Sequence, residues 1–310
     1  MRRVQYHRYG GPDVLALEEV DTPPPSRGQV LVRVRAAAAN AMDWKIRNGE
    51  MRAMTGRRFP RGVGHDFAGV IERVGEGVTR LQVGDEVLGG ALPKQAGAFA
   101  EYVIADGRSV AHKPAALTFP QAATLPVVGL TAYQAVTRAG KLQPGQHIFI
   151  NGCLGGVGRV AVQVATGIGA TVAGSCRSGS EAAAHQLGVG TVVAFDLDPA
   201  PLAGRFDVVF DTAGTLPFAT GRQMLKPGGK IIDIVPSFAK LARSILPGPY
   251  TAFMGRPNSD DLQHIANAAG RGDIATRISH TVPLADAIPA LIDLENAPTS
   301  SAGKLIITTD

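Results

Sequence analysis

The chain has 310 residues, of which 45% are apolar and 18% are charged, and its formal net charge at pH 7 is +5. This balance excludes a disordered chain, a collagen-like repeat and a small disulfide-stapled scaffold, and it allows one large domain or two ordinary ones. Glycine is overrepresented, with 38 residues and no fixed period. We therefore expect many tight turns.

Several features of the sequence indicate the cellular location of the chain and the partners it could have. Residues 1–20 contain no apolar core long enough for a secretory signal, and Cys153 and Cys176 are too few for a disulfide framework. A reducing, cytoplasmic location is the default expectation. The most apolar stretch, residues 115–136, is interrupted by prolines and polar residues, so we expect no membrane span. Because Lys and Arg are scattered, we do not expect a nucleic-acid partner.

The first third of the chain is typical of β structure. Residues 29–35 alternate apolar and polar side chains, and residues 68–74 and 99–104 are rich in strand-forming residues between glycines. Short strands with Gly and Pro between them predict a barrel-like or sandwich-like domain.

From about Phe119 apolar strands alternate with alanine-rich helices. This alternation predicts an α/β domain with a parallel sheet covered by helices. The expected strands are residues 147–151, 170–175, 206–211, 230–235 and 304–308, and the expected helices are residues 157–167, 180–187, 259–270 and 284–294.

A glycine-rich turn follows the strand at 147–151 and leads into an amphipathic helix. In a dinucleotide-binding fold, glycines at this place allow a tight turn and a close backbone approach, and the free N–H groups at the helix start bind a pyrophosphate. The candidate cofactor residues of this turn are Gly152, Leu154, Gly155, Gly156, Val157 and Gly158.

The next strand ends where the ribose of such a cofactor is bound. No Asp or Glu stands there to accept hydrogen bonds from a free 2′-hydroxyl; instead Arg177 lies between Ser175 and Ser178. A guanidinium group binds the oxygens of a 2′-phosphate in a bidentate manner, so this pattern favours NADPH over NADH. The alternative is a solvated arginine beside an N-cap serine, Ser178 or Ser180.

Taken together, these motifs resemble the medium-chain dehydrogenase/reductase superfamily, in its zinc-free quinone-oxidoreductase branch. The resemblance covers nearly the whole chain. It rests on the glycine turn and on residues 40–49, 64–69, 74–75, 83–87, 97–103, 130–133, 225–230 and 303–307.

The resemblance implies two interleaved domains. Residues 1–118 and 260–310 would form a GroES-like, strand-rich catalytic domain, and residues 119–259 a Rossmann domain with a doubly wound parallel sheet. The active site would lie in the cleft between the domains, where ligands commonly bind. The resemblance also implies a homodimer that forms by strand pairing of Rossmann domains.

Catalytic zinc requires three protein ligands, and the chain retains one of those found in zinc-dependent relatives. Asn40 stands where they have a cysteine, His65 matches their histidine, and Val127 lies near their third ligand. We therefore expect no metal. His65 is then either a structural relic near the cleft, which we favour, or a proton donor.

Without a Lewis acid, an isolated carbonyl is a poor hydride acceptor, whereas a quinone or a conjugated enone delocalises the developing negative charge. We expect NADPH to reduce such a small-molecule acceptor. By resemblance, Asn40 bonds a ribose or substrate oxygen and Thr131 holds the nicotinamide carboxamide. Asp43 orients this group or relays a proton; a structural helix cap is an equally good interpretation.

The remaining candidates follow later strands. The expected cofactor-lining residues are Thr212, Ala213, Gly214, Val235, Pro236, Phe253 and Met254, although ordinary core or dimer packing is slightly preferred for the last two. The basic and apolar segment 50–60 is either a substrate lid or, more simply, a solvated loop.

Two other functions stay open. One is an enoyl reductase of secondary metabolism, which would use the same cofactor geometry with a larger acyl pocket. The other is a non-catalytic NADPH-binding or RNA-binding member of the family.

Overall fold

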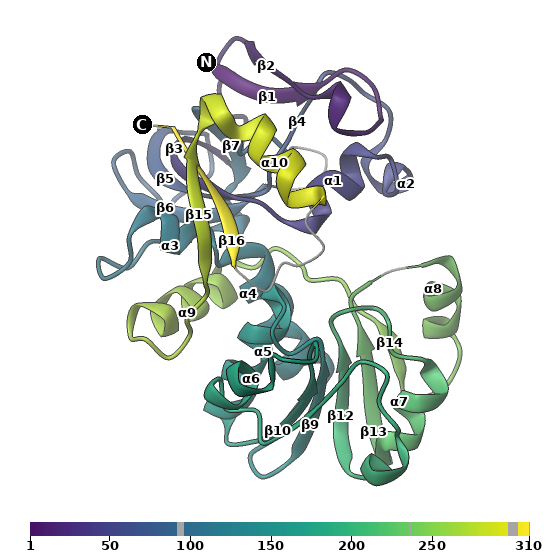
Figure 1. The fold of residues 1–310 in the computed structure, drawn as a ribbon. Helices are drawn as coiled ribbons and strands as arrows, with labels where there is room; N and C mark the ends of the chain where they lie inside the picture. Colours follow the sequence, from purple (N-terminus) through teal and green to yellow (C-terminus); the bar gives the residue numbers. More distant parts are fainter. Residues whose placement is uncertain (92–95, 236, 297–302, 310) are drawn as a thin grey trace. The chain divides into compact units, whose positions relative to one another are not determined.

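The computed structural model describes residues 1–91, 96–235, 237–296 and 303–309. The chain divides into two compact units (Figure 1). Unit 1 consists of Met1–Val127, Pro257–Gly272 and Thr276–Asp310, and unit 2 consists of Val128–Arg256 with Asp273–Ala275.

Unit 1 is rich in strands, as the alternating residues near its start predict. A three-stranded sheet has the order β2-β1-β4, and a seven-stranded sheet has the order β15-β16-β3-β5-β6-β8 with β7 paired to β3. The strands are β1 (Arg2–Tyr6), β2 (Ala16–Glu19), β3 (Gln29–Ala38), β4 (Arg61–Gly62), β5 (Asp66–Val74), β6 (Glu86–Gly90), β7 (Tyr102–Asp106), β8 (Val110–His112), β15 (Ile278–Pro283) and β16 (Lys304–Thr308).

The register of the large sheet brings distant segments to one place. Ala38 at the end of β3 pairs with Asp66 at the start of β5 on one side and with Ile306 of β16 on the other. The residues after β3 therefore lie beside the beginnings of β5 and β16. The helices of this unit are α1 (Ala41–Arg47), α2 (Arg52–Thr55), α3 (Phe119–Ala123), α9 (Ser259–Gly270) and α10 (Ala287–Asn296).

Unit 2 is a parallel α/β unit. Its six-stranded sheet has the order β11-β10-β9-β12-β13-β14, and every neighbouring pair is parallel. The strands are β9 (His147–Asn151), β10 (Thr171–Ser175), β11 (Thr191–Val193), β12 (Phe206–Asp211), β13 (Leu225–Asp233) and β14 (Tyr250–Ala252).

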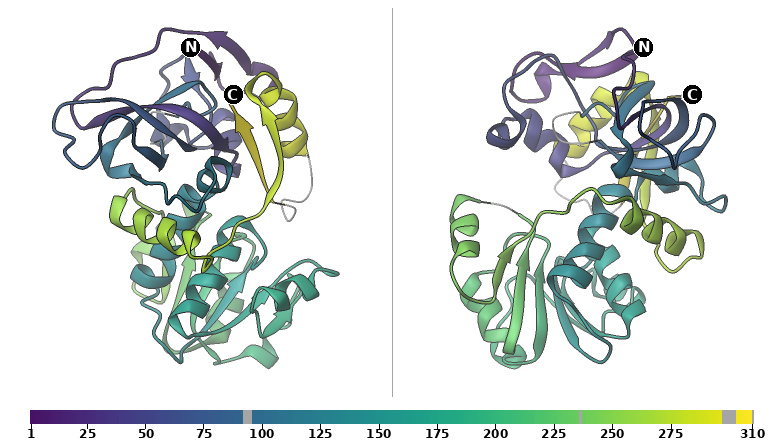
Figure 2. Two further views of the ribbon diagram at one scale, coloured as in Figure 1. Left: turned by 90° about the vertical axis from the view of Figure 1, so that its left-hand side faces the viewer. Right: turned by 180° about the vertical axis from the view of Figure 1, so that it is seen from behind.

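Helices cover both faces of this sheet (Figures 1 and 2). The chain passes from β9 through β10 to β11 in one direction across the sheet, and from β12 through β13 to β14 in the other. Because such connections are right-handed, the two series place their helices on opposite faces of the sheet. The order reverses at β9 and β12, which is where ligands bind in such sheets. The helices are α4 (Pro126–Gln134), which begins at the unit boundary and continues as a π-helical turn (Ala135–Ala139), α5 (Gly156–Ile168), α6 (Glu181–Gln186), α7 (Phe218–Met224) and α8 (Phe238–Ile245).

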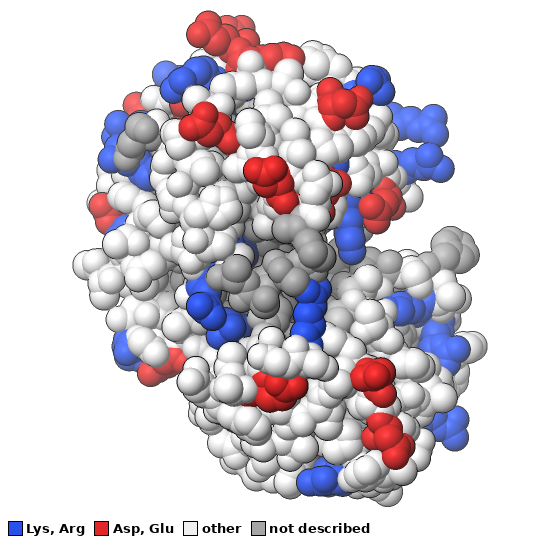
Figure 3. Space-filling view, in the orientation of Figure 1, with Lys and Arg blue, Asp and Glu red and all other residues white. Residues whose placement is uncertain are grey.

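The first unit extends beyond residue 118, where the sequence placed the domain boundary. The reason is α3, which packs against β3, β5 and β6 of unit 1. No helix among the described residues is long and apolar enough to cross a membrane. On the face seen in Figure 3, Lys and Arg are interspersed with Asp and Glu.

Candidate functional site

The glycine turn between β9 and α5 is closely packed. Gly152 has a φ of 84°, and a Cβ added there would lie 2.9 Å from Thr212 Oγ1. A Cβ on Gly158 would clash with the carbonyl oxygen of Gly152, so the first turn of α5 rests on the backbone of the loop. Gly155 is the N-cap of α5. Glycine therefore stands at each close contact between the loop and the first turn of α5. A pyrophosphate site requires such a loop, in which no side chain blocks the first N–H groups of the helix.

Four neighbouring strands end in buried polar side chains at one register. Ser175 pairs with Asn151, Asn151 with Asp211, and Asp211 with Asp233. The Ser175 hydroxyl donates to Asn151 Oδ1 at 2.5 Å, and Asn151 Nδ2 donates to Asp211 Oδ1 at 2.7 Å. We call these four residues the polar row; it crosses the carboxyl edge of the sheet on both sides of the strand-order reversal.

On one side, the polar row holds the glycine turn and the loop after β12. Ser175 Oγ accepts from the Gly152 N–H at 3.1 Å. Asp211 accepts from the N–H groups of Gly214 and Leu216 at 2.8 and 3.0 Å. The Thr212 hydroxyl donates to the Asn151 carbonyl at 2.7 Å. These contacts position the predicted cofactor loops through their backbones.

On the other side, Asp233 holds the segment that follows β13. It accepts from the Val235 N–H at 2.8 Å and from the Tyr250 hydroxyl at 3.0 Å, and it pairs with Lys240 Nζ at 2.7 Å. Lys240 also donates to the Gly214 carbonyl at 3.0 Å, so it ties the loops after β12 and β13 together. Pro236, a predicted cofactor residue, lies outside the described residues.

Burial raises the pKa of Asp211, and the nearby negative charge of Asp233 adds to this effect, while hydrogen bonds from Asn151, Leu216 and Gly214 oppose it. Sequence reasoning treated Asn151 and Asp211 only as strand ends and missed the polar row. The available signal was that β9, β10, β12 and β13 end in Asn, Ser, Asp and Asp.

The end of β10 carries the predicted 2′-phosphate residues. Arg177 and Ser178 are exposed, whereas Ser175 is fully buried and its hydroxyl is used within the polar row. Next to them, Cys176 is hydrogen-bonded to Cys153 of the glycine turn, and burial raises the pKa of the Cys153 thiol to about 12. Arg177 and Ser178 therefore lie at the surface, whereas Ser175 supports the turn.

Thr131 lies on α4 beside the segment that follows β14. A Cβ on Gly255 would lie 3.1 Å from Thr131 Oγ1, and Gln134 of α4 exchanges two hydrogen bonds of 2.9 Å with the backbone of Arg256. Thr131 is thus brought next to the segment that contains Phe253 and Met254. Phe253 is partly buried and Met254 is 48% exposed.

The other predicted residues gather in unit 1, in what we call the Asn40 cluster: Asn40, Asp43, His65, Asp66 and Lys304. Asn40 is the N-cap of α1. Asp43 accepts from the Asn40 N–H at 2.8 Å through Oδ2, while its Oδ1 lies 2.6 Å from His65 Nδ1. Asp43 therefore caps the helix and orients the histidine at once. His65 Nε2 is buried and has no partner in the described part of the chain.

Asp66 and Lys304 complete the cluster, and sequence reasoning did not select them. Lys304 Nζ donates to Asn40 Oδ1 at 2.7 Å and to Asp66 Oδ2 at 2.9 Å. Asn40 Nδ2 donates to Asp66 Oδ2 at 2.9 Å and to the Ala38 carbonyl at 3.3 Å. Both amide hydrogens of Asn40 are used, so this side chain has only acceptor capacity left for a ligand.

The segment 50–60 is anchored to unit 1. Arg61 donates to the Thr55 carbonyl at 2.8 Å, the Tyr9 hydroxyl lies 3.1 Å from Thr55 Oγ1, and the Phe59 ring packs edge-on against Tyr6 and Tyr9. The segment nevertheless presents exposed side chains, namely Arg52, Met54, Arg57 and Arg58. The segment is thus anchored through Thr55 and Phe59 and exposes mainly charged side chains. This agrees both with a substrate lid and with a solvated loop.

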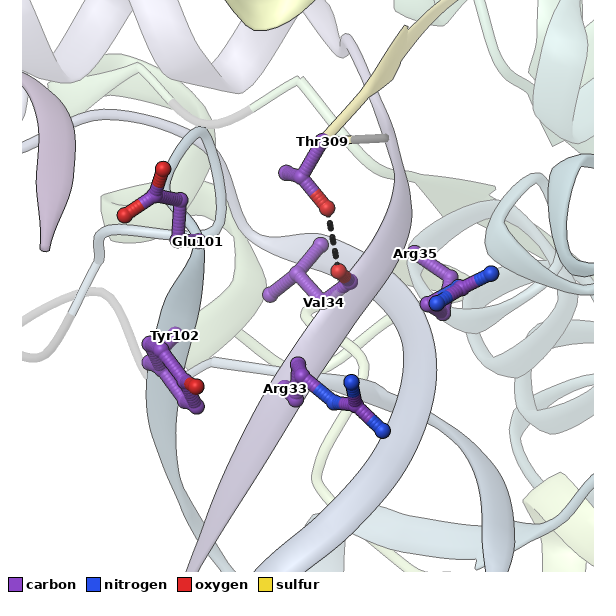
Figure 4. Close-up of a pocket in the computed structure, with 6 residues that line it drawn as sticks. All are labelled: Arg33, Val34, Arg35, Glu101, Tyr102 and Thr309. Atoms are coloured by element: carbon purple, nitrogen blue, oxygen red, sulfur yellow. Dashed lines mark hydrogen bonds between the residues drawn. The ribbon is translucent and has the colours of Figure 1, made fainter.

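A pocket of about 220 Å³ lies elsewhere in unit 1 (Figure 4). Its lining residues are Arg33, Val34, Arg35, Glu101, Tyr102 and Thr309, and none of them is a predicted site residue. The Thr309 hydroxyl donates to the Val34 carbonyl, and Glu101 pairs with Arg2 at 2.9 Å. The side chains of Thr309 and Glu101 thus serve the local structure.

Two family models match the chain: the alcohol dehydrogenase GroES-like domain over residues 26–115 and the zinc-binding dehydrogenase model over residues 187–307. The chain is 33% identical to the chloroplastic quinone-oxidoreductase QR1 of Triphysaria versicolor over 76% of its own length and 75% of that protein. It belongs to the quinone-oxidoreductase-like branch of the medium-chain dehydrogenase/reductase superfamily.

Other members of this superfamily extend the comparison. The chain is 35% identical to the chloroplastic NADPH-dependent alkenal/one oxidoreductase of Arabidopsis thaliana, over 76% of the chain and 62% of that protein. The solved structure of the quinone oxidoreductase from Coxiella burnetii is 28% identical, with a TM-score of 0.89 over 100% of this chain and 99% of that one. The GroES-like and Rossmann-like folds expected from the sequence are confirmed.

The zinc-binding description of one family model does not fit the residues of this chain. At the predicted position, Asn40 and Asp66 are bonded to the ammonium of Lys304, so a cation is already present. Among the described residues, no group of three or more His, Cys, Asp or Glu side chains is arranged to hold a metal. A catalytic zinc needs three such ligands.

Proposed function

We propose that the chain is a zinc-independent, NADPH-dependent reductase of quinones or conjugated enones. The observation that carries the proposal is the glycine turn with the adjoining end of β10. There the backbone is closely packed at Gly152 and Gly158, as a pyrophosphate site requires, and Arg177 and Ser178 are exposed with no acidic side chain between Ser175 and Ser180. Similarity to a quinone oxidoreductase and to an NADPH-dependent alkenal/one oxidoreductase supports both the cofactor and the acceptor class.

The residues of unit 2 would hold the cofactor. The first N–H groups of α5, from Gly156 to Gly158, face no intrahelical acceptor and would bind the pyrophosphate. Arg177 and Ser178 would bind the 2′-phosphate, and Thr131 the carboxamide. When bound, NADPH supplies a hydride. The loops held by the polar row would line the same ligand, with Ala213, Gly214, Val235, Phe253 and Met254 as neighbours.

In unit 1, Asn40 would accept a hydrogen bond from a ribose hydroxyl, because its amide hydrogens are occupied by Asp66 and Ala38. This excludes Asn40 as a donor to a substrate carbonyl. His65 exchanges a proton only at Nε2, since Asp43 holds Nδ1, and Nε2 is buried. We therefore assign Asp43 and His65 to positioning, and water to the final protonation.

A panel of acceptors tests the proposal. NADPH consumption should be rapid with a quinone and with an α,β-unsaturated ketone, and slow with the saturated ketone of the same skeleton, because only conjugated acceptors delocalise the charge. Equal rates for the saturated and unsaturated ketones would contradict the assigned acceptor class. NADPH binding without turnover of any acceptor would point to a non-catalytic member.

A further inference from the structure

Within the Asn40 cluster, the ammonium group of Lys304 has one more N–H donor than it has partners among the described residues. An ammonium carries three N–H groups. Two of them face Asn40 Oδ1 and Asp66 Oδ2, at 2.7 and 2.9 Å. For the third, the described part of the chain provides no partner, and the side chain is 11% exposed. A partly buried donor of this kind is available to a ligand or to water.

The other members of the cluster cannot donate to a ligand. Asp66 is fully buried, and its oxygens accept from the Val127 N–H, Asn40 and Lys304. Asn40 has used its two amide hydrogens, and His65 is 1% exposed. Lys304 alone combines a remaining donor with access to the surface.

We propose that Lys304 is a catalytic residue that donates its third N–H to the carbonyl oxygen of the acceptor. This role rests on the proposed function. Hydride from NADPH adds to the β-carbon of the enone, the carbon–carbon π pair shifts toward the carbonyl, and the oxygen takes the negative charge. Water then protonates the α-carbon, which gives the saturated ketone and NADP⁺. Lys304 keeps its proton throughout.

The neighbours of Lys304 hold its ammonium group in place for this role. Asp66 compensates the charge of Lys304 in the resting protein, so the ammonium is held in a partly buried place without a metal. Preorganised donors are most effective where water is excluded, and the two bonds to Asn40 and Asp66 hold the nitrogen in position before the charge develops.

The test separates catalysis from structure with two variants. Lys304→Met should lower kcat for an enone about 100-fold, the usual effect of removing one oxyanion donor, and leave the Kd for NADPH unchanged. Because this variant leaves Asp66 buried without its counter-ion, its Tm should also fall. The double variant Lys304→Met/Asp66→Asn removes the unpaired charge and should recover Tm while kcat stays low.

A purely structural lysine predicts the opposite result. Recovery of both Tm and kcat in the double variant would overturn the catalytic role. Lys113 provides a matched control in the same unit, because its side chain is 5% exposed and lies 3.0 Å from Glu86 Oε2. Lys113→Met should lower Tm and leave kcat unchanged.

The wild-type rate on the same enone distinguishes a failure of the proposed function from a failure of the proposed role of Lys304. Absence of turnover with every conjugated acceptor would overturn the proposed function, and the role of Lys304 with it. Turnover by the wild type, together with wild-type kcat in the double variant, would overturn the role of Lys304 alone.

Discussion

The candidate site residues of unit 1 and those of unit 2 are organised differently. In unit 2 the side chains of the polar row accept hydrogen bonds mainly from backbone N–H groups, and they thereby set the course of the loops. In unit 1 the Asn40 cluster binds mainly side chains to one another around one ammonium group. Changes in the polar row should therefore alter cofactor affinity and stability together, whereas loss of the Lys304 ammonium group should lower turnover beyond its effect on stability.

The largest effect should come from the glycine turn. Gly158→Ala places a Cβ against the Gly152 carbonyl, so the turn or α5 must move, and we expect a loss of about 3 kcal/mol of unfolding free energy, at the upper end for overpacking. Gly167→Ala in the same helix meets no atom within 4 Å and should stabilise by about 0.5–1 kcal/mol. Urea unfolding of both variants measures this, and equal stabilities would refute the packing argument.

A smaller effect is expected from Asp211. Asp211→Ala leaves the N–H groups of Gly214 and Leu216 without their acceptor and should cost about 2 kcal/mol of unfolding free energy while weakening NADPH binding. Calorimetric titration and urea unfolding of the same sample measure the two quantities. Weakened binding with unchanged stability would contradict the idea that the row acts through the loops.

The pH dependence of stability offers a second test of Asp211. Because burial raises the pKa of Asp211 in the folded state above its ordinary value, the folded state binds the proton more tightly than the unfolded chain. This contribution is present in acid and is lost as pH rises from the unfolded pKa through the folded pKa. The stability of the wild type relative to Asp211→Asn should therefore decline across that acidic interval in urea unfolding. A relative stability that rises with pH would reverse the assigned direction.

Arg177 should affect cofactor choice more than stability. Arg177→Ala removes a charge-assisted contact to the 2′-phosphate and should raise the KM for NADPH about tenfold or more, with NADH use nearly unaltered. Steady-state rates with each cofactor measure this. Equal losses for both cofactors would contradict the 2′-phosphate assignment.

The smallest expected effect is that of a chelator. Since Asn40 and Asp66 already bind Lys304, incubation with a strong zinc chelator should leave kcat unchanged. Inactivation that is reversed by zinc would restore a metal to this cluster.

The sequence predicted the parts of the site that local patterns encode. The glycine turn and the strand before it were recognisable because Gly152, Gly155, Gly156 and Gly158 meet local backbone requirements. The capping role of Asp43 was one of the two interpretations that its spacing from Asn40 allowed. These features depend on neighbours within a few residues.

The sequence did not predict features that depend on distant pairing. Lys304 reaches Asn40 because β16 pairs with β3, and the polar row exists because four strands share one register. Likewise, α3 belongs to unit 1 through its packing on β3, β5 and β6. Sheet register is set by long-range contacts, so a single sequence does not reveal which polar side chains meet.

The most direct test of the central claim is an equilibrium titration of the wild-type chain with NADPH and with NADH, followed by cofactor fluorescence. We predict that NADPH binds at least about tenfold more tightly, because the Arg177 guanidinium group would contact its 2′-phosphate and no Asp or Glu stands between Ser175 and Ser180 to bind a free ribose hydroxyl. Equal affinities, or tighter binding of NADH, would contradict it.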